Sequence, residues 1–106
     1  MAEVRLVKFR FKPGGKEAWL EWCGQMKRRS NEIFETLRNE GMVAEACFLS
    51  HDEDALYYFL EAENFEQAES AFRRSLYTID REHMQIKTAA LERAEGLECL
   101  FFFDNR

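Results

Sequence analysis

The chain has 106 residues, and its 20 Asp and Glu against 15 Lys and Arg give a formal net charge of −5. This length fits one domain, residues 1–106, and a hydrophobic content of 46% predicts a packed core and excludes a disordered chain. No apolar run approaches the roughly 18 residues of a membrane span, and the first residues lack the apolar stretch of a signal peptide. We therefore expect a cytoplasmic protein with no membrane partner.

Acidic residues are concentrated in the middle of the chain. Between Glu40 and Glu69 there are nine acidic residues and neither Lys nor Arg. Basic residues cluster near the N-terminus, but a pI near 5.1 and the acidic middle oppose binding to phosphates. No nucleic-acid partner is expected.

The first elements along the chain are a predicted strand and a predicted long helix. Apolar residues alternate over residues 4–11 with the period of two that a strand requires, and Pro13-Gly14-Gly15 ends this run. From about residue 16 to residue 40 they recur at helical spacing, and Gly41 supplies a helix stop. The pattern predicts one helix over residues 16–40.

A hairpin follows the helix. Residues 42–49 and 55–62 are two apolar runs joined by the short polar sequence SHDED. Two such runs around a polar loop predict two antiparallel strands.

The last third of the chain predicts more helix and a final strand. Asn64, followed by a glutamine three residues later, resembles a capping box and opens a helical region over residues 65–90. The sequence LYT at 76–78 leaves open whether this region is one helix or two. Gly96 precedes an apolar run over residues 97–103, which we interpret as the fourth strand.

This order, strand-helix-strand-strand-helix-strand, predicts an α+β fold of the ferredoxin-like type. Such a fold is a four-stranded antiparallel sheet of strand order 4-1-3-2, with the helices on one face. Alternation along the strands predicts which residues face the helices: Val7, Phe9, Phe11, Ala44, Ala46, Phe48, Leu56, Tyr58, Leu60, Leu97, Cys99, Phe101 and Phe103.

The opposite sheet face is also rich in apolar residues. A monomer rarely exposes an apolar patch of several hundred Å². We therefore expect this face to pack against a twofold-related second copy, which predicts a homodimer. The apolar residues assigned to the face are Leu6, Val43, Cys47, Leu49, Tyr57, Phe59, Leu100 and Phe102.

The three cysteines, Cys23, Cys47 and Cys99, are far apart in sequence, and no C-x-x-C pair is present. Each lies in an apolar run, so we predict three small buried hydrophobic residues in a reducing compartment, with a reactive thiolate as the minor alternative. The acidic loop 51–54 lacks the spaced ligands of a calcium site. We expect no disulfide, no metal and no cofactor.

Several segments together resemble a known family. VRLVKFRFKPGGKEAWLEW, FETLRNEGMVAEACF, ALYYFLEAEN and above all TIDREHMQI are similar to an uncharacterised domain-of-unknown-function family of the dimeric α+β barrel superfamily. The resemblance implies a ferredoxin-like protomer and a sheet-to-sheet dimer, but no established activity. The superfamily also contains cofactor-independent monooxygenases of the antibiotic-biosynthesis type, haem-degrading enzymes and isomerases, and a fold alone does not choose among them.

His83 is the strongest candidate for a catalytic residue. It lies on the apolar stripe of the second helical region, and Asp80 precedes it by one helical turn, close enough to orient the imidazole. A buried histidine held in this way could act as a general base toward an acidic phenol or enol. The alternative is a hydrogen-bonded histidine of the core or of the dimer interface.

Four further residues are candidates for ligand binding. Tyr58 is predicted to face the same layer as His83, and Trp19 and Trp22 approach that layer from the first helix. These aromatic side chains could line a flat apolar pocket, or simply fill the core. Arg10 could clamp a ligand carboxylate, or instead form an interface ion pair.

The sequence favours a homodimer that holds a small hydrophobic or amphipathic ligand between sheet and helices. The first alternative is a cofactor-independent monooxygenase or isomerase acting on a small aromatic or enolisable substrate. The second is a structural or regulatory dimer with no ligand.

Overall fold

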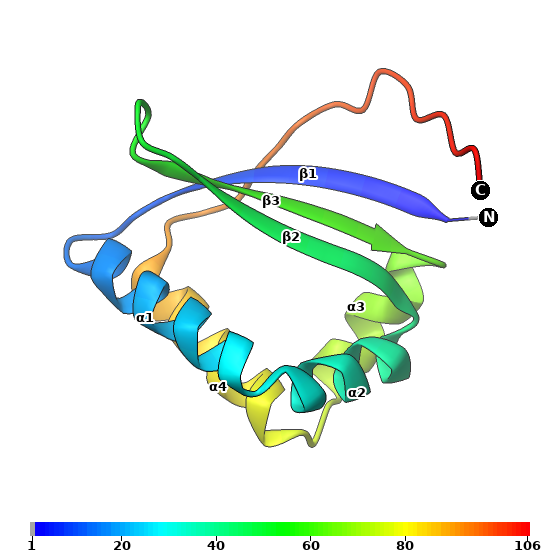
Figure 1. Ribbon diagram of the computed structural model, residues 1–106, viewed down its shortest axis with the longest axis horizontal. Coiled ribbons are helices and arrows are strands. Elements are labelled where there is room, and N and C mark those ends of the chain that lie inside the picture. Colours follow the sequence, from blue (N-terminus) through cyan, green and yellow to red (C-terminus); the bar gives the residue numbers. More distant parts are fainter. Residues whose placement is uncertain (1) are drawn as a thin grey trace.

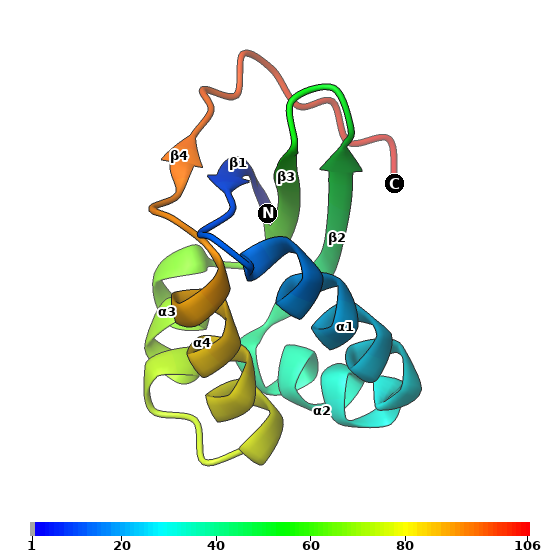
Figure 2. The same ribbon diagram turned by 90° about the vertical axis from the view of Figure 1, so that its left-hand side faces the viewer.

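The computed structural model describes residues 2–106 and has the predicted ferredoxin-like architecture. Its antiparallel sheet has the strand order β2-β3-β1-β4, and all the helices cover one face of it (Figures 1 and 2). The elements are β1 (Glu3–Arg10), α1 (Gly15–Arg28), α2 (Ser30–Glu40), β2 (Met42–Ser50), β3 (Ala55–Ala62), α3 (Phe65–Arg73), α4 (Thr78–Ala90) and β4 (Glu95–Gly96).

Local sequence signals set several of these boundaries. Gly14 and Gly41 adopt left-handed backbone conformations, with φ of 74° and 73°, at the start of α1 and the end of α2. The Asn64 side chain caps α3 by accepting a hydrogen bond from the backbone N–H of Gln67. The glycine stop and the asparagine cap lie where the sequence predicted them.

The predicted helix over residues 16–40 is in fact two helices that meet at Arg29. Arg29 leaves helical geometry, and its backbone N–H bonds to the carbonyls of both Gln25 and Met26. Its guanidinium pairs with Glu32 on α2 and Glu82 on α4. The continuous helix was therefore wrong, because contacts with α4 compete with the local helical pattern at this joint. The second helical region is also divided, into α3 and α4.

The fourth strand differs most from its prediction. β4 has two residues, Glu95 and Gly96, which pair with β1, and residues 97–103 form no regular element. This segment runs past the sheet on the side away from the helices (Figure 1). Its side chains are exposed, so the predicted strand and its inward-facing residues were wrong. The cause is that a run of consecutive apolar residues does not by itself supply a hydrogen-bonding neighbour.

A bulge in β2 reverses the facing of most of that strand. The register shifts by one residue between Met42 and Ala44, so Glu45, Cys47 and Leu49 pair with Leu60, Tyr58 and Leu56 on the helix-facing side. A one-residue slip moves every later side chain to the other face. The prediction that Ala44, Ala46 and Phe48 face the helices was therefore wrong, as was the outward facing of Cys47 and Leu49.

The main core lies between the sheet and the helices. Trp19, Trp22, Leu56 and Ile79 are its largest fully buried side chains. Cys23 is half-buried, whereas Cys47 and Cys99 are exposed, so the prediction of three buried cysteines was wrong for two of them. Within residues 2–106, no helix is long and apolar enough to cross a membrane.

Candidate functional site

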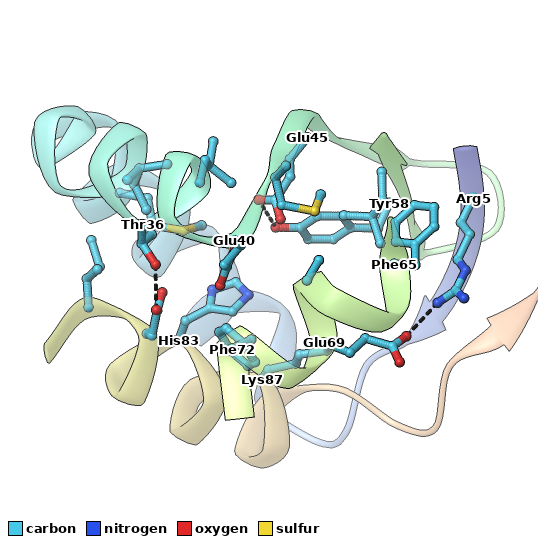
Figure 3. Close-up of a pocket in the computed structure, with 18 of the residues that line it drawn as sticks. Arg5, Thr36, Glu40, Glu45, Tyr58, Phe65, Glu69, Phe72, His83 and Lys87 are labelled. Carbon is cyan, nitrogen blue, oxygen red and sulfur yellow. Dashed lines mark hydrogen bonds and ion pairs between the residues drawn. The ribbon is translucent and has the colours of Figure 1, made fainter. Parts of the chain in front are cut away.

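A cavity of about 230 Å³ opens between the helix layer and the inner face of the sheet (Figure 3). Its apolar walls come from β1, β3, α2, α3 and α4, with one residue each from α1 (Met26) and β2 (Met42). Polar and charged groups lie among them: Arg5, Thr36, Glu40, Glu45, Tyr58, Glu69, Asp80, His83 and Lys87.

His83 projects from α4 into this cavity, with three aromatic rings around it. The indole N–H of Trp22 donates to His83 Nδ1 at 2.9 Å, and the rings of Trp19 and Phe72 lie 5.6 and 6.2 Å away between centroids. Burial, with a smaller contribution from the nearby charge of Lys87, lowers the pKa of His83 to about 4. The imidazole is therefore neutral at pH 7. Because Nδ1 accepts a hydrogen bond, the ring proton sits on Nε2, which makes that nitrogen a donor.

Asp80 joins helices instead of orienting His83. Its Oδ2 accepts hydrogen bonds from the hydroxyls of Thr36 on α2 and Ser75 in the α3–α4 connection, each at 2.5 Å. All three residues are buried. The orienting role predicted for Asp80 thus belongs to Trp22.

Glu40 is the most unusual group in the cavity. Its side chain, at the end of α2, is 9% exposed, and its Oε2 has no hydrogen-bond partner among residues 2–106. Burial, with a smaller contribution from the charges of Asp80 and Glu45, raises the pKa of Glu40 to about 8. The carboxyl is therefore mostly protonated at pH 7, and it presents an O–H donor to the cavity.

Glu45 and Tyr58 form the sheet side of the polar lining. The Tyr58 hydroxyl donates to Glu45 Oε2 at 3.4 Å (Figure 3). Burial raises the pKa of both groups, and for Tyr58 the charge of Glu45 adds to the effect. Burial lowers the pKa of Lys87 on the facing helix, while Glu45 opposes that change. The site therefore holds several titratable groups whose burial favours their neutral forms.

A partly exposed ion pair also lines the cavity. Arg5 on β1 pairs with Glu69 on α3 at 2.6 Å, and the Arg5 guanidinium also covers the Phe65 ring at 4.2 Å. Both charged side chains are about half exposed, at 49% and 52%. An exposed pair of this kind contributes little to stability, but it places charge of both signs beside the cavity.

The structure brings together some of the predicted site residues and separates others. Tyr58, His83 and Asp80 line the cavity. Trp19 and Trp22 lie behind His83 as core residues, at 0% and 1% exposed.

Arg10 lies away from this site. It is exposed at the end of β1, and its neighbour Phe9 is the residue that turns inward to the core. Alternation along the strand therefore places Arg10 on the outer sheet face.

Six of the polar cavity residues were not predicted as site residues from the sequence, namely Arg5, Thr36, Glu40, Glu45, Glu69 and Lys87. Glu45 lies between Ala44 and Ala46, which were predicted to face the helices, so alternation placed Glu45 on the outer face. The bulge in β2, which reverses this, leaves no mark in the alternation pattern. Glu40 was treated as the last residue of a helix, and nothing in the sequence shows that α3 and α4 enclose it. The partial signal for Lys87 was its spacing, one helical turn after His83.

No cluster of three or more metal-ligating side chains is present in the described chain, residues 2–106. His51 and its acidic neighbours are exposed in the β2–β3 loop. The expectation of no metal and no cofactor stays a prediction.

The sequence over residues 2–105 matches the family of unknown function DUF6176, and the chain belongs to that family. No protein of curated function matches the sequence significantly.

Two solved structures are similar to this fold. The crystal structure of a conserved protein from Methanosarcina mazei Go1 has a TM-score of 0.60 and 19% sequence identity, over 92% of this chain and 89% of that chain. A protein from Shewanella oneidensis has a TM-score of 0.58 and 15% identity, over 91% of this chain and 86% of that chain. At such identities the similarity shows the fold alone.

Proposed function

We propose that this member of the DUF6176 family binds a small, uncharged amphipathic molecule in the cavity between sheet and helices. The observation that carries the proposal is Glu40, a buried carboxyl whose Oε2 has no partner among residues 2–106. An unpaired buried polar atom costs roughly 1–3 kcal/mol, and a ligand oxygen that accepts from it would remove that cost.

The chemistry of the lining indicates the kind of ligand. Protonated Glu40 and the Nε2–H of His83 are two donors, so they suit a carbonyl or hydroxyl oxygen. Aliphatic and aromatic side chains such as Ile33, Leu37 and Phe72 would contact the apolar part of the molecule. The cavity volume of about 230 Å³ is below the roughly 300–1,000 Å³ of drug-sized sites, which favours a small ligand.

The environment of His83 favours binding over base catalysis. The lone pair of Nδ1 already accepts from Trp22, and the proton on Nε2 must leave before that nitrogen could act as a base. The monooxygenase or isomerase alternative therefore requires a change of tautomer that breaks the bond to Trp22. As a proton donor in a binding site, His83 needs no such change.

The binding proposal is tested first by native mass spectrometry of the purified protein beside a denaturing spectrum. An added mass that disappears on denaturation would identify a bound molecule. Thermal shifts with small ketones, phenols and primary amines would then be compared for Glu40→Gln, Glu40→Leu and the control Glu35→Leu, which changes an exposed carboxyl on the same helix.

Each outcome of that comparison is distinct. The rise in melting temperature caused by a ketone or phenol should persist in Glu40→Gln, because glutamine keeps an N–H donor. The rise should disappear in Glu40→Leu and be unchanged in the control Glu35→Leu. For the wild type, affinity should fall above pH 8 as the Glu40 proton is lost. An amine that binds only the wild type and binds better at high pH would contradict the proposed ligand class.

We further propose that a second copy of the chain covers the outer sheet face. The support is apolar exposure: Phe48 on β2 is 61% exposed, and the C-terminal segment is exposed along Leu100–Phe103. Gel filtration with light scattering would test this. Phe48→Glu should convert a dimer to a monomer, whereas the control Leu20→Glu, at an exposed position on α1, should not. A monomeric wild type would contradict the proposal.

A further inference from the structure

The amine of Lys87 lies in the layer between α4 and the sheet. Lys87 follows His83 by one turn of α4, so the two side chains share the helix face that lines the cavity (Figure 3). The Lys87 Nζ atom lies 5.2 Å from the centre of the Phe9 ring on β1. Phe9 is a buried wall of the same cavity. The distance therefore places the lysine amine where α4 faces β1, beside the space that a ligand would occupy.

Lys87 differs from the other lysines in having no polar partner. The chain has five lysines, all within the described residues 2–106. Lys8 and Lys16 each form an ion pair at 2.7 Å, Lys12 donates to a backbone carbonyl at 2.6 Å, and Lys27 is exposed in the last turn of α1. Among residues 2–106 the Lys87 amine has an aromatic ring as its neighbour but no hydrogen bond or ion pair. Of the five, Lys87 alone lines the cavity.

The surroundings of Lys87 favour its neutral amine. Burial lowers the pKa of Lys87, and the charge of Glu45 offsets only part of that change. A neutral amine is a nucleophile, whereas an ammonium group is not. Desolvation in an apolar site is one of the ways in which lysines that form Schiff bases are activated.

Two donors on the same cavity lining suit the oxygen atom of a carbonyl group. One is the Nε2–H of His83, whose Nδ1 accepts from Trp22. The other is the protonated carboxyl of Glu40, which is 9% exposed and has an unpaired Oε2 among residues 2–106. Condensation of an amine with a carbonyl group needs a nucleophile for the carbon and a proton source for the oxygen. The cavity holds both.

We propose that the cavity ligand is an aldehyde or ketone and that Lys87 condenses with it to form a Schiff base. This inference rests on the binding function proposed above and narrows the class of ligand. His83 orients the carbonyl oxygen, and Glu40 supplies the proton that removes this oxygen as water.

The atoms and charges of this condensation balance. The Lys87 nitrogen attacks the carbonyl carbon, a C–N bond forms, and a proton moves from nitrogen to oxygen to give a carbinolamine. Glu40 then gives its proton to the hydroxyl group, the C–O bond breaks, and water leaves. The products are an iminium cation at Lys87 and the carboxylate of Glu40, so the net charge is unchanged. No oxidant or reductant is consumed.

Reductive trapping tests the proposal, because hydride converts an iminium into a stable secondary amine. The native protein would be incubated with cyclohexanone and cyanoborohydride, digested with trypsin and analysed by mass spectrometry. Trypsin does not cleave after an alkylated lysine, so the expected product is an uncleaved peptide 82–93 that has gained the mass of cyclohexanone less one oxygen atom. Modification of Lys87 should exceed that of the exposed Lys27 by about tenfold or more.

Variants separate the covalent step from binding. Lys87→Arg keeps a cation beside Phe9 but cannot form an imine, so trapping at this position should vanish while cyclohexanone, without reductant, still raises the melting temperature. Lys87→Met repeats the test without the larger guanidinium. Glu40→Gln keeps a donor but has no acidic proton, so it should bind the ketone and trap it about tenfold more slowly. The matched control Lys27→Met should be trapped at Lys87 like the wild type.

An unmodified Lys87 in the folded wild type would overturn the proposal, and so would equal modification of Lys87 and Lys27. Equal trapping at Lys87 in guanidinium would also contradict it, because the reactivity is ascribed to the folded cavity. If any of these results accompanies a thermal shift that Glu40→Leu abolishes, the binding function stands and only the covalent step fails. If the wild type shows neither shift nor adduct with the ketone, both proposals fail.

Discussion

The Trp22 indole and the His83 imidazole form a hydrogen bond of 2.9 Å that connects α1 to α4 at the back of the cavity. Trp22 is 1% exposed, so its N–H has no access to water if His83 is removed. The bond therefore fixes the imidazole tautomer and satisfies a buried donor at the same time.

Replacing His83 by leucine should destabilise the fold, although it adds an apolar side chain to an apolar layer. The Trp22 N–H would lose its acceptor, which costs about 1–3 kcal/mol of unfolding free energy. His83→Gln retains an acceptor oxygen and should recover part of that loss. Guanidinium unfolding followed by tryptophan fluorescence measures both variants. A leucine variant as stable as the wild type would show that this bond contributes nothing.

Glu40 should make the protein less stable as the pH rises. Its folded-state pKa of about 8 lies above the ordinary value of 4.5, so between these values the folded chain keeps a proton that the unfolded chain has lost. Unfolding free energy should then fall by up to about 1.4 kcal/mol per pH unit from this group. Glu40→Gln should remove the decline between pH 6.5 and 8. A pH profile unchanged by the substitution would contradict the assigned protonation.

His83 should contribute a pH dependence of the opposite sign. Its pKa is about 4 in the folded protein against the ordinary 6.5, so the unfolded chain binds the extra proton first. This contribution to stability is complete above pH 6.5 and is lost as the pH falls toward 4. Subtracting the unfolding profile of His83→Gln from that of the wild type isolates it. A difference that shrinks as the pH rises from 4 to 6.5 would have the wrong sign.

Two helical glycines should respond in opposite ways to alanine substitution. A Cβ at Gly15 would overlap the carbonyl oxygen of Ala90, which already accepts a hydrogen bond from Lys12 N at 2.9 Å. Gly15→Ala should cost about 1–3 kcal/mol, because backbone must move. At Gly24 the new Cβ meets only the mobile end of Arg28, so Gly24→Ala should stabilise by roughly 0.5–1 kcal/mol. Urea unfolding of the two variants and the wild type measures both effects. Equal changes in unfolding free energy for Gly15→Ala and Gly24→Ala would contradict the close approach of Gly15 to Ala90.

The buried carboxylate of Asp80 should make both of its hydroxyl donors important. Thr36→Val and Ser75→Ala each remove one hydrogen bond to Oδ2 while keeping most of the volume. Each should cost about 1.5–3 kcal/mol, as expected for a bond to a charged group. Because the donors share one oxygen, the double variant should not be additive. The control Thr88→Val, at an exposed position on α4, should be neutral in the same unfolding assay.

The order of elements was readable from the sequence because it depends on short-range signals. Alternation in β1 and the cap at Asn64 helped to predict the ferredoxin-like order, which the structure confirms and which agrees with the similarity to solved structures. The candidate site was only partly readable. Tyr58 and His83 were placed in one layer by their periodicity, whereas the same reasoning put Glu45 on the wrong face.

What the sequence by itself determined was the class of fold and the apolar layers, since the periods of two and 3.6 residues are properties of each segment alone. Tertiary structure decided the break at Arg29, the facing of residues after the β2 bulge, and the short β4. Each of these depends on partners from distant segments, such as Glu82 for Arg29 and β3 for the bulge. The unpaired carboxyl of Glu40 follows from the same long-range packing.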